Sequence, residues 1–356
     1  MALTGSNEAS NGIRENPPSM KEESSNMALM KTSAAALAWI GRQGTRAVAA
    51  LVLIGIAFPW AGALLKPFVS EAIFVLLSLA FLRMDLRAFQ GYLKRPAIVI
   101  TATAWTMMAI PALFGIICVL FGIKAQSPDL LLAIILQGVA SPMMAAPAFA
   151  SLMGLDATLV LTTLVTSTAL TPITAPLFTF AFAGPTLTLS PLQLGIKLFL
   201  ILAGSALTGF VFRRVAGLPM INQYKNQIDG FNIIMLFVFV AAVMENVAAS
   251  FLNAPLNAVK LLALSFLVYF AVLIITSLVF LWAGRQRAFA LGFMASQRNM
   301  GLMLAATGGA LPHLAWLYFA LSQFPIYLSP QLLTSPARRL AAPLQKSAKA
   351  RTKILK

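Results

Sequence analysis

The chain has 356 residues, of which 59 % are hydrophobic and only 10 % are charged, and its mean hydropathy is +0.85. Soluble proteins carry about 25 % charged residues, so this composition excludes a soluble enzyme, a collagen-like fibre and a disulfide scaffold. The formal charge of +16 invites a nucleic-acid interpretation, but the basic residues lie at the ends of apolar segments, where they fix membrane topology. We therefore expect a multi-span membrane protein in contact with lipid and no binding of nucleic acid.

Both ends of the chain are polar. Residues 1–33 are rich in Ser, Asn, Glu and Pro and contain no apolar run typical of a signal peptide, so we expect a disordered N-terminal tail. Residues 332–356 include seven of the 26 basic residues. This segment is expected to be a basic cytoplasmic tail that is attracted to anionic lipid.

Apolar stretches of about 20 residues, the length that crosses a bilayer core, recur ten times between Pro, Gly and charged residues. The first five predicted spans, within residues 46–183, are Arg46–Leu65, Phe68–Arg87, Pro96–Gly122, Pro128–Gly154 and Asp156–Ala183. The second five, within residues 191–331, are Pro191–Ala216, Asp229–Leu252, Leu256–Ala283, Gln286–Ala310 and His313–Gln331. With ten spans, 21 Lys and Arg residues lie on one side of the membrane and four on the other. The positive-inside rule then places both termini in the cytoplasm, and we expect the protein in the inner (plasma) membrane.

Two predicted spans at corresponding places are interrupted. The fourth contains Ser141, Pro142 and Pro147, and the ninth contains four successive polar residues, 296–299. An offset of 155 residues aligns these two segments and brings Gly154 onto Gly309. Because five is an odd number, two tandem five-helix repeats have opposite orientations in the membrane. The fold expected is therefore all-α, with ten transmembrane helices in two inverted five-helix repeats.

Paired broken helices at matching places indicate a transporter site, because unpaired backbone in lipid is tolerated only where protein or a water-filled cavity covers it. We expect broken helices 4 and 9 to cross at the membrane midplane. The alternative is a proline kink in a packed helix together with one salt-bridged arginine.

Arg298 is the most informative residue. A charge at mid-bilayer costs at least about 2.5–3.5 kcal/mol, so Arg298 requires a partner. One candidate is an organic anion held by the guanidinium fork, and the other is Glu245, the only acidic residue deep in a predicted span. Glu245 is also a candidate proton relay. The sequence shows no metal-ligand spacing and no catalytic triad around the single histidine, His313, so we expect no metal, no cofactor and no enzyme.

Over residues 46–331 the chain resembles the bile acid:sodium symporter family. The resemblance rests on the order of four motifs, which are Met84 to Leu86, Lys94 to Pro96, Thr162 to Pro172 and Arg298 to Leu302. It implies a core of spans 3–5 and 8–10, a moving panel of spans 1, 2, 6 and 7, and coupling to sodium.

The sodium sites of that family are degraded here. The position of the family's glutamate is Met294, and the serine–asparagine pair of its fourth span falls on Ala145 and Ala146. The family's glutamine falls on Arg298, whose fixed positive charge we expect to replace that of sodium. Among the positions of the family's sodium sites, only Thr163 and Asn299 match the family's residues.

The sequence therefore predicts a secondary transporter of an organic anion that works by alternating access and is uncoupled or proton-coupled. Its substrate would contact Arg298, Asn299 and Gln297, with Ser141 opposite and Thr163 along the route. The competing interpretation is a non-transporting membrane sensor or binding protein that retains the fold.

Overall fold

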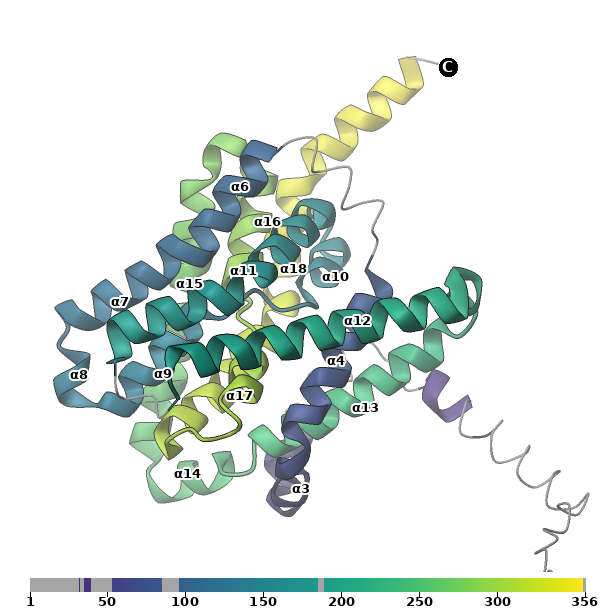
Figure 1. Cartoon of the computed structure of the whole chain (residues 1–356). Helices are drawn as coiled ribbons and strands as arrows, with labels where there is room; N and C mark the ends of the chain where they lie inside the picture. Colours follow the sequence, from purple (N-terminus) through teal and green to yellow (C-terminus); the bar gives the residue numbers. More distant parts are fainter. Residues whose placement is uncertain (1–31, 33–34, 40–52, 85–95, 185–188, 355–356) are drawn as a thin grey trace, which may run out of the picture.

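The computed structural model describes residues 32, 35–39, 53–84, 96–184 and 189–354. The predicted N-terminal tail lies outside the described residues except for Thr32, and so do most of the two family-like motifs between Met84 and Pro96. Among the described residues, every regular element is a helix (Figure 1).

Six helical stretches are long and apolar enough to cross a membrane. They are Pro59–Arg83, Pro96–Leu120, Ala157–Ala183, Pro191–Gln223, Lys225–Asn253 and Pro255–Val279. A shorter apolar helix covers Pro128–Val139. These lengths and compositions are those of the all-α, multi-pass membrane class that the sequence predicts.

The first described elements are α3 (Pro59–Leu65), the 3₁₀ turn η1 (Lys66–Phe68) and α4 (Val69–Arg83). They pack beside α13 (Lys225–Val243). Lys66 lies at the far end of α13, where its Nζ is 2.7 Å from a carboxylate oxygen of Glu245. Together, α3, η1 and α4 form the apolar stretch Pro59–Arg83, and each of them contacts α13.

Both ends of this region of the chain lie at the start of α13. The carbonyl of Leu37 abuts Gly230 so closely that no side chain would fit there. Arg83, the last residue of α4, forms an ion pair of 2.6 Å with Asp229. Because Lys66 pairs with Glu245 and Arg83 pairs with Asp229, α4 runs antiparallel to α13, from its far end to its start.

The middle of the chain forms six further helical elements. These are α6 (Pro96–Ala104), the π-helical turn η2 (Trp105–Ala109), α7 (Ile110–Leu120), α8 (Ile123–Gln126), α9 (Pro128–Val139) and α10 (Ala146–Leu152). The long helix α11 (Ala157–Ala183) follows, and Asp156 begins it by accepting a hydrogen bond from the Leu159 amide.

The remaining helices repeat this alternation of long and broken elements. They are α12 (Pro191–Gln223), α13, α14 (Val247–Asn253), α15 (Pro255–Val279), the 3₁₀ turn η4 (Leu281–Ala283), α16 (Arg285–Ser296), α17 (Met300–Ala306) and α18 (His313–Ile354). A capping box formed by Ser190 and Gln193 starts α12, and Gly217, with a φ of 75°, bends it. The predicted seventh span is divided into α13 and α14. The basic segment after residue 331 continues α18 through Ile354.

The most buried elements are the broken ones. All seven residues of α17 are buried, as are most residues of α16 and the second half of α9. α16 packs against α11, α15 and α18 (Figure 1). The polar breaks thus lie in the interior of the protein.

Candidate anion site at the broken helices

Two helical segments are interrupted, as the sequence predicts. α9 ends at Val139 and α10 begins at Ala146, whereas α16 ends at Ser296 and α17 begins at Met300. In both pairs the first helix has 12 residues and the second has seven. The break in the first pair is centred on Pro142, which has no amide hydrogen and disfavours helix in the residue before it.

The two breaks bind each other through their backbones. The Met143 amide donates to the Gln297 carbonyl at 2.6 Å, and the Asn299 amide donates to the Ser141 carbonyl at 2.8 Å. These bonds form an isolated antiparallel bridge between Pro142 and Arg298. Each break thereby satisfies backbone groups that the other helix has left unpaired.

The two broken segments also end alike. Gly154, after α10, and Gly308, after α17, both have a positive φ. In each segment the next amide bonds back five residues, from Leu155 to the Ala150 carbonyl and from Gly309 to the Leu304 carbonyl. Gly309, which the offset of 155 residues aligns with Gly154, also has a positive φ.

Arg298 is 2 % exposed and is held by two carbonyl groups. Its Nη1 donates to the Ala140 carbonyl at 2.7 Å and to the Thr106 carbonyl at 3.4 Å. Ala140 directly follows the last residue of α9, where a helix presents unpaired carbonyls and a partial negative charge that favours a cation.

The Thr106 carbonyl is available to Arg298 because it has no partner within its own helix. It lies in the π-helical turn η2, where the Ile110 amide bonds to the Trp105 carbonyl. The corresponding partner of Thr106, five residues on, is Pro111, which has no amide hydrogen. The sequence analysis missed this acceptor, although a proline inside an apolar span was the signal that a carbonyl would be left over.

The other edge of the Arg298 guanidinium has no partner. Both Nε and Nη2 are buried without a hydrogen bond. These two atoms carry parallel N–H groups, which is the geometry that binds the two oxygens of a carboxylate. One edge is thus fixed to the protein, and the donors of the other edge are unused.

Glu245 does not fill that edge. It forms its ion pair with Lys66 at 2.7 Å, and Lys66 also lies over the Trp316 ring at 5.1 Å from its centroid. Among the described residues, the ion pairs formed do not include Arg298. The direct Arg298–Glu245 pair that the sequence left open is therefore not formed in this structure.

The side-chain amide nitrogen of Gln297 forms hydrogen bonds within the protein and is not free to bind a substrate. Its Nε2 donates to Ser329 Oγ at 2.7 Å, to the Tyr269 hydroxyl at 3.2 Å and to the Ile326 carbonyl at 3.3 Å. These bonds tie the second break to α15 and α18. Only its Oε1 is without a partner. Gln297 thus positions the break, and only its oxygen is free for a ligand.

The hydroxyl groups predicted for the site are buried and unpaired. Ser141 lies in the first break and Thr163 lies on α11, which packs against α9, α10 and α16. Neither hydroxyl has a hydrogen-bond partner, and the same holds for Ser167, one turn beyond Thr163 on α11. Asn299 caps α17 by accepting from the Leu302 amide at 3.0 Å. The structure therefore joins Ser141 and Asn299 by a hydrogen bond and places Thr163 on the adjoining helix.

Within the described ranges, His, Cys, Asp and Glu side chains do not gather in threes that could hold a metal ion. The two breaks provide a buried cation, Arg298, and unpaired polar atoms on Ser141 and Gln297. Comparison with the models of known protein families and with curated proteins finds no match to this chain.

Proposed function

We propose that the protein is a secondary transporter of an organic anion that works by alternating access, with a fold like that of the bile acid:sodium symporter family. The observation that carries this proposal is the unpartnered Nε and Nη2 edge of Arg298. This edge lies where two broken helices bind each other. In carriers, sites built on paired broken helices hold the substrate near the membrane midplane.

The proposal includes ten spans in two inverted five-helix repeats. Leu37 and Arg83 lie at the start of α13 and Lys66 lies at its far end, which supports separate first and second spans. The equal lengths of the two broken pairs and their antiparallel bridge support related fourth and ninth spans that cross. With both termini in the cytoplasm of an inner-membrane protein, the Arg83–Asp229 pair is at the cytoplasmic end and the Lys66–Glu245 pair is at the outer end.

An anionic substrate follows from the electrostatics of Arg298. A buried cation is stable only if it is paired or its donors are hydrogen-bonded. The Ala140 and Thr106 carbonyls engage one nitrogen, Nη1, but supply no full negative charge. A carboxylate on the free edge would supply both the charge and the two remaining acceptors. Arg298, Asn299, Gln297 Oε1, Ser141 and Thr163 are the proposed substrate contacts.

Sodium is not expected to drive this carrier. The family-like acidic position is Met294, whose side chain is buried and cannot bind a hard cation through oxygen. Ala145 and Ala146 likewise contribute no side-chain oxygen. The charge of Arg298 would repel a sodium ion nearby. Uptake is therefore uncoupled or proton-coupled, with Glu245 as the candidate proton carrier.

The test is uptake of radiolabelled mono- and dicarboxylates into proteoliposomes that contain the wild type or Arg298→Met. We expect uptake by the wild type with or without a sodium gradient and a loss of about a hundredfold in the variant, because a bidentate, charge-assisted contact is removed. Lys124→Met, which removes a cation outside the breaks, is the matched control. Undiminished uptake by Arg298→Met would contradict the proposal, and strict sodium dependence would overturn the uncoupled mechanism.

Counterflow separates transport from binding alone. A carrier preloaded with unlabelled carboxylate exchanges it for labelled carboxylate across the membrane. Binding that depends on Arg298 without counterflow would instead identify the sensor or binding protein that the sequence left as the alternative.

A further inference from the structure

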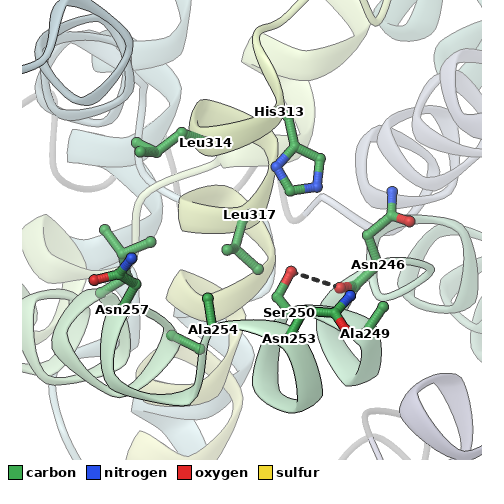
Figure 2. A pocket seen from close by; sticks show the side chains of 11 residues that line it. Asn246, Ala249, Ser250, Asn253, Ala254, Asn257, His313, Leu314 and Leu317 are labelled. Atoms are coloured by element: carbon green, nitrogen blue, oxygen red, sulfur yellow. Dashed lines mark hydrogen bonds between the residues drawn. The ribbon is translucent and has the colours of Figure 1, made fainter.

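A mostly apolar pocket with several polar side chains lies away from the broken helices, at the junction of α14, the start of α15 and the start of α18 (Figure 2). Its volume is about 440 Å³, which is within the range of small-molecule sites. Asn246, Ser250, Asn253, Asn257 and His313 supply its polar groups. The pocket shares none of these residues with the proposed anion site.

Helical spacing places the polar side chains around the pocket. Asn246, Ser250 and Asn253 are four and three residues apart, so they share one face of α14. Asn257 joins them from α15, and His313 faces them from the start of α18 (Figure 2). Ser250 Oγ donates to the Asn246 carbonyl at 2.7 Å, so the hydroxyl oxygen remains free to accept a hydrogen bond.

The three asparagine amides are available to a ligand. Each offers two donors and an acceptor. In the part of the chain that the structure describes, no other residue forms a hydrogen bond with these amide groups. Three such groups around one cavity can bind several hydroxyl groups that each donate and accept.

The pocket does not favour an ion. Asp, Glu, Lys and Arg are absent from the residues that line it. Glu245, which precedes Asn246 in the chain, is paired with Lys66 at 2.7 Å. A charged ligand would therefore lose hydration without gaining a counter-charge. The opposite wall is apolar and includes Leu314 and Leu317.

We propose that this pocket binds a sugar or another uncharged polyol, with its hydroxyl edge on the asparagines and its C–H face on the leucines. A free sugar and the headgroup of a glycolipid have this same chemistry. The proposal goes beyond anion transport and does not depend on it.

The experiment is saturation-transfer NMR of methyl glucoside, sorbitol and myo-inositol with the full chain in phosphatidylcholine nanodiscs, which avoid glycosidic detergents. We expect transfer to at least one polyol in the wild type. The double variant Asn253→Leu/Asn257→Leu should bind at least about tenfold more weakly, because it loses about two neutral hydrogen bonds. Asn222→Leu, at an exposed site on α12, is the matched control and should bind as the wild type does.

Thermal melting of each variant verifies folding, and His313→Leu gives a second, independent change in the pocket. Absence of transfer from all three polyols, or equal transfer in the double variant, would overturn the proposal, as would tighter binding of glucuronate than of methyl glucoside. Nanodiscs doped with a monoglucosyl diacylglycerol distinguish the sources. Loss of the free-sugar signal in them identifies the headgroup as the ligand, and an unchanged signal identifies the free sugar.

Discussion

Both breaks interrupt a buried helix, but different groups stabilise the two interruptions. In the first, residues 140–145 leave the helical conformation, and their backbone is held by hydrogen bonds of Ser141 and Met143 to the opposite break. In the second, only residues 297–299 leave the helical conformation, and three polar side chains hold it in place. The first break is therefore held mainly by backbone groups, and the second is held mainly by side chains. Substitutions should disturb the second break more than the first.

Gln297→Leu is expected to have the largest effect on stability. The change removes the hydrogen bonds to Ser329, Tyr269 and the Ile326 carbonyl and leaves buried groups unsatisfied, at a cost of about 2–3 kcal/mol. The measurement is thermal unfolding in detergent. Gln223→Leu, at an exposed position on α12, should leave the melting temperature nearly unchanged. Equal melting of the two variants would show that the second break does not depend on these bonds.

Arg298→Lys tests the guanidinium fork separately from the charge. Lysine keeps the positive charge but cannot present two parallel N–H groups, so we expect anion uptake to fall about tenfold, equivalent to about 1.4 kcal/mol. The loss should be smaller than that of Arg298→Met. If the lysine variant transports as well as the wild type does, charge alone is sufficient and the free edge has no special role.

Pro142→Ala is expected to have the smallest effect. Alanine would restore an amide at position 142, but the Ser141 and Gln297 carbonyls are still engaged by the opposite break. We expect a change of at most about 1 kcal/mol in unfolding free energy and uptake within about twofold of the wild type. A larger loss would mean that proline, and not the contact between the breaks, sets the local conformation.

The sequence was sufficient to locate both breaks, because proline and consecutive polar residues in an apolar span are local signals. It could not identify the partners of Arg298. The Thr106 acceptor depends on a π-helical turn, and a hydropathy pattern does not reveal an extra residue in a helical turn.

Glu245 was left as a candidate partner for a similar reason. The sequence indicates only that Glu245 lies within an apolar span, whereas its actual partner, Lys66, is brought to it by the packing of η1 against α13. Such ion pairs depend on contacts between segments that are far apart in the sequence, and local residue spacing does not predict those contacts.

The π-helical turn near Thr106 also changes the phase of the helix that contains it. A continuous α-helix that buries Thr106 would bury Leu113 and Ile117 on the same face, yet both are exposed. Phe114 and Cys118, one position later, are buried instead. A helical wheel drawn with one period from residue 96 to residue 120 would therefore rotate every side chain after the turn by about 100°. Spin labels or cysteine probes intended for the outer surface of α7 should be placed by counting from Ile110.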